Sequence, residues 1–458
     1  MSPPPPEPSS DRRLPFIRAV VDIRRGEWEA VAWSIAYFFL VLFGYAVLKP
    51  FRDELAVGLN DKQQARLFTG TVLAMLVANP LYTALVSWLP RRWFVPSAYV
   101  FFAINLTVFA LLWRDSREVR SDDFNMAFFV WMSVYNLFIT AIFWSVMTDL
   151  WTIAQSKRVF AIIGMGGTLG FIVASEVVKR WAKKGEDGVA ILPTWAFFAM
   201  SIACLLLIGI CLWRLARIGG ILSRDRDKPR AVRAHQREPG KRSFKALLFA
   251  LTRPYLLAVS GYVILMTATN TVLWNQQNVI LATHFDSSES RRAALATISQ
   301  MQQGLTLFVQ CFLSAWIIRK IGVGLTLSIL PFVTLLGFAA LSIAMTQGRE
   351  SQTVYLVFVT LLVVRHGLQH ALSRPTREVL FTGVSQEERY ASKTFIDTLV
   401  YRVGDVGAIN TIALVNDRLS PRTEGPSSEP PPASATISLL LMAIPFVGVW
   451  IALSVYLG

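Results

Sequence analysis

Long apolar runs recur along the chain, and they constrain the fold more than any other feature of the sequence. Of 458 residues, 53% are hydrophobic and 16% are charged, and the mean hydropathy is +0.46. A soluble protein of this size carries more charge. A helix needs about 20 apolar residues to cross a bilayer, and in lipid its backbone bonds internally. The sequence therefore predicts an all-α membrane protein.

We predict twelve transmembrane helices in two sets of six. The first six are Trp28–Leu48, Leu67–Leu89, Ser97–Trp113, Met126–Met147, Phe160–Val178 and Pro193–Trp213. The last six are Pro254–Thr283, Ala293–Ile318, Ile321–Met345, Val354–Leu372, Thr394–Val415 and Ile437–Tyr456. This arrangement, with a polar linker at its centre, is typical of a major-facilitator-like fold.

The chain accordingly divides into four parts. Residues 1–27 are rich in proline and are expected to be disordered. Residues 28–213 and 254–458 form the two six-helix halves, and residues 214–253 form a basic linker. We interpret the linker as a cytoplasmic loop near anionic lipid, with no nucleic-acid partner. The first apolar run is too long for a signal peptide and is expected to remain as a span.

Basic residues set the orientation. Lys and Arg are in excess on the side that carries both termini and the linker, which by the positive-inside rule is the cytoplasm. We therefore expect a multi-pass protein of the inner (cytoplasmic) cell membrane with both termini cytoplasmic, in contact with the lipid bilayer and acting as a monomer.

Metal and cofactor motifs are lacking. The three cysteines lie inside apolar runs, at spacings that fit neither a zinc site nor a disulfide framework. His366 and His370 have helical i, i+4 spacing but no further ligand pattern. We expect no cofactor and no enzymatic activity. Gly166 and Gly170, four residues apart, instead predict close packing between helices.

A charged cluster closes the first span in "YAVLKPFRDEL". On a helix Lys49, Arg52 and Asp53 share a face, so that Lys49 can pair with Asp53 while Arg52 has no acid of its own. Charge inside a membrane segment is costly and normally faces a cavity or a partner. Two readings stay open: an anion-binding wall of a transport pathway, or a basic end that snorkels to the interface.

The stretch "VLWNQQN" within the seventh span is weakly similar to "VLKPFRD" at the end of the first. Aligning the two stretches places polar residues at matching points of the two halves, where a central substrate site lies in such folds. The residues that we expect to read the rest of a ligand are Trp274, Asn275, Gln277, Asn278 and, from the eighth span, Gln303. Hydrogen bonding between helices is an equally good account of Gln303.

Charged residues also interrupt the tenth and eleventh spans. Arg365 carries a permanent charge inside the tenth. On a continuous helix Lys393, Asp397, Tyr401 and Asp405 would line one face, and Arg402 would reach Asp405. We expect Arg365, Lys393 and Arg402 to supply positive charge to the site. A purely structural pairing of Lys393 with Asp397 is the competing interpretation.

Several of these stretches together resemble one family. "LKPFRDELA", "FW" followed by "SKRVF" and "GMGGTLG", and above all "RE.LF...S.EERY..K.FID....R" are similar to the nucleotide transporters of plastids and intracellular bacteria, the ATP/ADP-translocase family. The resemblance runs from the first span to the eleventh. It implies twelve spans, a major-facilitator-like fold and exchange of phosphorylated nucleotides, and it carries two basic site residues onto Arg52 and Lys393.

One family feature is missing. The family has an acidic residue before the "FW" of the fourth span, which falls near Met132, and no acid lies between Met126 and Met147. A divergent bacterial member with another anionic substrate fits this departure. The drug-antiporter signature is also incomplete, because "WLPRRW" lacks its glycine and aspartate.

We therefore expect a transporter that exchanges an anionic, phosphorylated solute by alternating access. Arg52 and Lys49 are the leading contacts, and Asp53, Asp397 and Asp405 are expected to form ion pairs with neighbouring cations. Two other classes stay open. One is a proton-coupled exporter of a drug or lipid-like compound, with Asp397 or Asp405 as the proton carrier. The other is a membrane sensor or scaffold that transports nothing.

Overall fold

The computed structural model describes residues 27–57, 59, 61–88, 91–113, 121–151, 153–182, 191–222, 253–380, 396, 400–419 and 433–458. Within these ranges the chain is helical. The helices of the first part are α2 (Trp28–Ala46), α3 (Lys49–Ala56), α4 (Asp61–Trp88), α5 (Arg91–Leu112), α6 (Asp122–Leu150), α7 (Ile153–Trp181) and α8 (Thr194–Leu222). Those of the second are α10 (Pro254–His284), α11 (Ser288–Phe312), α12 (Ser314–Met345), α13 (Gln352–Leu368), the π-helical turn η4 (Gln369–Ser373), α14 (Arg374–Leu380), α16 (Tyr401–Leu419) and α17 (Ala433–Tyr456).

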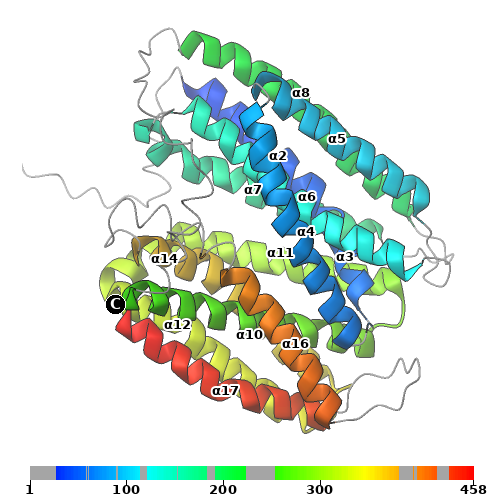
Figure 1. Cartoon of the computed structure of the whole chain (residues 1–458), viewed down its shortest axis with the longest axis vertical. Coiled ribbons are helices and arrows are strands. Elements are labelled where there is room, and N and C mark those ends of the chain that lie inside the picture. Colours follow the sequence, from blue (N-terminus) through cyan, green and yellow to red (C-terminus); the bar gives the residue numbers. More distant parts are fainter. Residues whose placement is uncertain are drawn as a thin grey trace, which may run out of the picture.

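The helices pack as two bundles that lie side by side, α2–α8 in one and α10–α17 in the other (Figure 1). Each bundle has its own hydrophobic core, built from buried residues between 30 and 215 in the first and between 256 and 457 in the second. Phe38 stacks on Phe143 with ring centroids 4.1 Å apart in the first core. In the second, Tyr262 packs edge-on against the buried Trp450.

The two ends of the bundles differ. We call one end the terminal face, because Gly458 contacts Gly324 there and Tyr255 donates a hydrogen bond to the carbonyl of Leu380 close by. The other end is the turn face, where α2 passes into α3 and α10 into α11. Serine side chains cap helices that begin at the turn face: Ser121 caps α6, Ser287 caps α11 and Ser351 caps α13.

Nine helices of the described ranges are long and apolar enough to cross a membrane, which makes the chain a multi-pass membrane protein. The predicted count of twelve stays a prediction. The helices α11 and α16 are too polar to qualify, yet they pack against the other helices of the bundles. Together with α4 they bury polar residues and expose apolar ones: in α4, Leu73, Leu76 and Val77 are exposed, whereas Gln64 and Thr71 are buried. These helices contact helices of the other bundle, and their polar side chains point into the protein.

Some predicted boundaries are wrong. The first span extends past the predicted Leu48 to Ala56, because only a turn at Val47 and Leu48 separates α2 from α3, with Pro50 in the first turn of α3. The eighth ends at Phe312, before the predicted Ile318, and Ser314 begins α12, which bends where Gly322 takes a φ of 78°. The tenth continues through η4 and α14 to Leu380. Most of the predicted linker, 223–252, lies outside the described residues.

The glycines of α7 lie against α2. A Cβ at Gly166 would come within 2.7 Å of the carbonyl oxygen of Ile35, and one at Gly170 would overlap the carbonyl oxygen of Phe39. The predicted close packing of helices at these two glycines is therefore confirmed. The helices α2 and α7 approach at backbone distance, which only a residue without a Cβ allows.

Candidate functional site

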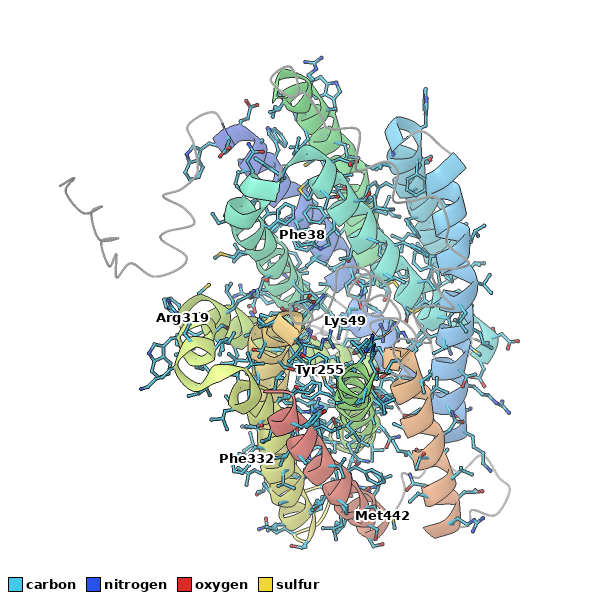
Figure 2. All side chains as sticks on the ribbon, turned by 60° about the vertical axis from the view of Figure 1, so that its left-hand side comes forward. Phe38, Lys49, Tyr255, Arg319, Phe332 and Met442 are labelled. Carbon is cyan, nitrogen blue, oxygen red and sulfur yellow. The ribbon has the colours of Figure 1, made fainter. Side chains whose placement is uncertain are left out.

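The charged cluster of the first span lies on α3, one short break after α2. Lys49 Nζ lies 2.6 Å from Asp53 Oδ2, and Arg52 Nε lies 3.1 Å from Asp53 Oδ1. Arg52, for which helical spacing left no acid, thus shares the carboxylate that pairs with Lys49. Two cations on one buried carboxylate leave a formal charge of about +1 at this point, which favours an anion. Figure 2 shows Lys49 between the two bundles.

Aromatic rings surround Arg52 and link it to the second bundle. Its guanidinium carbon lies 4.4 Å above the ring of Phe129, and its Nη1 is 3.5 Å from the hydroxyl of Tyr45. Phe129 in turn packs edge-on against Trp274 of α10, with ring centroids 6.1 Å apart. The structure therefore brings Arg52 and Trp274, two of the predicted site residues, into contact with the same phenylalanine ring.

The amide side chains of α10 differ in what they contact. Asn275 is buried and donates to Asp61 Oδ1 at 3.0 Å and to Gln64 Oε1 at 3.1 Å, both on α4. Gln277 is buried. Asn278 is also buried, and neither atom of its amide has a hydrogen-bond partner within the described ranges. Asn275 thus joins the bundles, whereas Asn278 retains a free amide for a ligand or water.

Two glutamines of α11, Gln300 and Gln303, differ in their surroundings. Gln300 donates to Glu176 Oε2 of α7 at 2.8 Å, so that it serves as a hydrogen bond between bundles. Gln303, the predicted contact, is half-buried one turn further along. Gln300 therefore forms a hydrogen bond between helices. The role of Gln303 as a ligand contact stays a prediction.

Arg365 is held by uncharged partners. It is 3% exposed, and its guanidinium donates to Thr334 Oγ1 at 2.9 Å, Thr269 Oγ1 at 2.6 Å, the carbonyl of Met266 and the amide oxygen of Asn270. This arrangement ties α13 to α10 and α12 inside the second bundle. The donors that the sequence analysis assigned to an anion are therefore engaged in the packing of that bundle.

The eleventh span contributes a smaller cluster. Arg402 Nη1 lies 3.3 Å from Asp405 Oδ2, as the i, i+3 spacing predicted, and Thr271 of α10 donates to Asp405 Oδ1 at 3.1 Å. Lys393 and Asp397, the other predicted members, lie outside the described residues.

A polar interface between the bundles, which the sequence analysis missed, lies at the turn face. Glu54 is fully buried and accepts a hydrogen bond from Ser288 at 2.9 Å, and Arg292 Nη2 lies 3.6 Å from its second oxygen. The guanidinium of Arg292 stacks over Phe51 at 4.5 Å. Two sequence features could have indicated this interface. Glu54 directly follows the paired Asp53, and Arg291 and Arg292 stand together near the start of α11.

Further contacts continue this interface along α4 and α16. Asn416 donates to Asp61 Oδ2 at 2.9 Å, and Lys62 pairs with Asp417 at 3.3 Å. The pair Lys62–Asp417 is exposed and contributes little to stability. The buried contacts of Glu54, Arg292 and Asp61 carry the interface, which closes the turn face between the bundles.

Two helical bundles packed side by side are the architecture of one class of membrane protein. The structure matches that of the POT family transporter PepTSo with a TM-score of 0.63 and 11% identity, over 94% of this chain and 98% of the other. At this identity the likeness shows the fold alone, which is that of the major-facilitator-type transporters. This part of the sequence prediction is confirmed.

Residues 124–421 match the model of the TLC ATP/ADP transporter family, and the chain belongs to that family. It is 24% identical over 307 residues to the ADP,ATP carrier protein 1 of Chlamydia muridarum, a match that covers 61% of this chain and 56% of the relative. It is 21% identical over 416 residues to the chloroplastic ADP,ATP carrier protein 1 of Arabidopsis thaliana, covering 81% and 65%. The chain thus matches less than two thirds of these relatives' length.

Proposed function

We propose that the protein transports an anionic, phosphorylated solute such as a nucleotide, by exchange between the two sides of the membrane. The observation that carries the proposal is the cluster on α3. Lys49 and Arg52 share one carboxylate, remain 26% and 17% exposed, and lie beside the boundary between the bundles. A phosphate group would balance the surplus positive charge, and the fork of an arginine suits its oxygens. The family relatives named as ADP,ATP carriers support a nucleotide.

Transport by this fold requires the site to open to each side in turn. The turn face is closed by buried contacts of Glu54, Asp61 and Arg292. We take the two halves, 28–213 and 254–458, as the units that rock about the site. With both termini cytoplasmic, the closed face would be the outer one, and the structure would represent the inward-facing state.

Uptake into liposomes tests the exchange. We expect uptake of a labelled nucleotide or sugar phosphate to depend on unlabelled solute inside and to continue when a protonophore collapses the proton gradient. The reason is that Asp53 pairs with both Lys49 and Arg52, and these two cations stabilise its carboxylate. Uptake that needs the gradient and ignores internal solute would favour the proton-coupled exporter. Absence of uptake for every phosphorylated solute would favour a sensor or scaffold.

The substitutions Arg52→Ala and Lys393→Ala test the site. Each should weaken binding of the transported solute about 10–150-fold, since a lost contact to an ionised group costs roughly 1.5–3 kcal/mol. The measurement is the ligand-induced rise in melting temperature of the purified protein. Arg418→Ala, an exposed cation at the end of α16, is the matched control and should bind normally. Normal binding by both Arg52→Ala and Lys393→Ala would remove the central site.

A further inference from the structure

The tenth span contains a π-helical turn. Gln369–Ser373 form η4 between α13 and α14, and the extra residue of such a turn rotates the following helix by about 100°. Turns of this kind are rare and are found mostly at functional sites. The turn packs against α12, since Ser314 Oγ donates to the carbonyl of Ala371 within it, whereas Arg365 makes its hydrogen bonds before the turn begins. The turn also sets which side chains of α14 face inward.

Those residues line a pocket. A cavity of about 250 Å³ lies beside η4 and α14 near the terminal face, and its polar lining comes from Gln369, His370, Ser373, Arg374, Arg377 and Tyr401. Glu378 also lines it and is exposed. Two guanidinium groups against one carboxylate leave the pocket with a surplus positive charge. Ser373 already exchanges a hydrogen bond with Tyr262, so the arginines are the principal donors.

Among the residues that line the pocket, Arg374 offers the most hydrogen-bond donors to an anion. It is exposed, and its guanidinium makes no hydrogen bond or ion pair with any residue of the described ranges. An arginine offers five N–H donors in a planar fork, which fit two oxygens of a phosphate group at once. A pocket of this volume lies below the roughly 300–1,000 Å³ of sites for whole organic ligands. It therefore fits a single phosphate group.

Two histidines continue from this pocket along the same helix. The rings of His370 and His366 stack with centroids 4.1 Å apart, one helical turn from each other. His370 itself lines the pocket, and His366 lies one turn nearer the turn face. Nε2 of His366 is buried and has no hydrogen-bond partner within the described part of the chain. An anion moving from the pocket toward Lys49 would meet these imidazoles on its way.

We propose that the pocket of η4 and α14 is a second anion site, which binds a phosphate group of the solute between the terminal face and the cluster of Lys49 and Arg52. This inference rests on the proposed function for the identity of the solute, but not for the site itself. Arg374 and Arg377 would hold the phosphate oxygens, and the step from this site to Lys49 passes the stacked histidines. The site would make capture of the solute a two-stage process.

The test uses the full-length protein in detergent and in liposomes. Binding of inorganic phosphate, a labelled nucleotide and a labelled sugar phosphate is measured for the wild type, Arg374→Ala, Arg374→Glu and Arg52→Ala. Because Arg374 is exposed, its variants should fold, as an unchanged melting temperature without ligand would show. Lys320→Ala, an exposed cation beside Trp316 on α12, is the matched control.

Arg374→Ala should weaken phosphate binding at least tenfold and Arg374→Glu more, whereas Lys320→Ala should retain it. In liposomes Arg374→Ala should raise the KM for the organic solute and leave kcat nearly unchanged, because capture and not the central step is impaired. Wild-type phosphate binding by both Arg374 variants would overturn the second site while leaving transport through Arg52 intact. Loss of phosphate binding in a protein that transports no organic phosphate would support the site and refute the proposed function.

Discussion

Replacing Arg292 with methionine is expected to open the turn face. Glu54 is fully buried, and the substitution would remove the guanidinium of Arg292 that lies beside its carboxylate. Breaking a buried ion pair from one side costs about 3–5 kcal/mol. The pair here is long, at 3.6 Å, and Nε and Nη2 of Arg292 make no hydrogen bond within the described ranges. We therefore expect a loss near the lower limit, about 3 kcal/mol.

Thiol labelling measures this opening. Ala296 of α11 is fully buried in the core of the first bundle, so a cysteine there should react only when the bundles separate. The background replaces the native Cys204, Cys211 and Cys311 by alanine. In Arg292→Met the cysteine at position 296 should label at least tenfold faster. Arg291→Met, which loses a hydrogen bond to the carbonyl of Phe285 and leaves the pair of Glu54 with Arg292 in place, is the control and should label slowly.

A double substitution distinguishes the charge from the packing. Glu54→Gln together with Arg292→Met removes both charges, and buried pairs replaced on both sides are often neutral. The double variant should therefore label more slowly than Arg292→Met alone. If the two variants label equally fast, the stacking of Arg292 on Phe51, and not its charge, holds the turn face closed.

Substitution of Gly170 is expected to have the largest effect on folding. A side chain there would overlap the carbonyl oxygen of Phe39, and a backbone atom inside a packed helix cannot move aside. Gly170→Ala should cost about 1–3 kcal/mol or more, and Gly170→Leu should prevent assembly of the first bundle. The measurement is the fraction of monodisperse protein recovered in mild detergent and its melting temperature.

Gly164 provides the matched control on the same helix. A Cβ at Gly164 would meet nothing within 4 Å. Gly164→Ala should be neutral or stabilise α7 by up to about 1 kcal/mol, since alanine is the better helix former. Equal behaviour of Gly164→Ala and Gly170→Ala would show that α2 and α7 do not approach as closely as described.

Local spacing predicted much of this structure and tertiary contacts decided the rest. The i, i+4 spacing was enough to pair Lys49 with Asp53, and i, i+3 spacing paired Arg402 with Asp405. Both pairs lie within one helix, where spacing fixes the distance. Position along one helix could not show that Thr334 and Asn270 converge on Arg365, because those residues come from other helices.

The interface at the turn face also could not be predicted from spacing within one helix. Glu54 falls off the face of Lys49 and Asp53, and the sequence offered it no partner. Its partners Ser288 and Arg292 lie in the other bundle, more than 200 residues away. Glu54 follows Asp53 directly on α3, and its side chain accepts a hydrogen bond from Ser288 across the boundary. Local periodicity carries no information about which helix of the other bundle lies there.

The polarity of α4, α11 and α16 has a consequence for biogenesis. The ribosome produces α4 about 300 residues before α16, which supplies its partners Asn416 and Asp417. At roughly 5–20 residues per second this interval lasts on the order of 15–60 s. Asp61 lacks Asn416 during that time, and its other partner, Asn275 of α10, itself follows Asp61 by 214 residues. Nascent α4 would therefore need shelter within the insertion machinery or its aqueous vestibule, and translation speed between α4 and α16 would influence how much protein assembles.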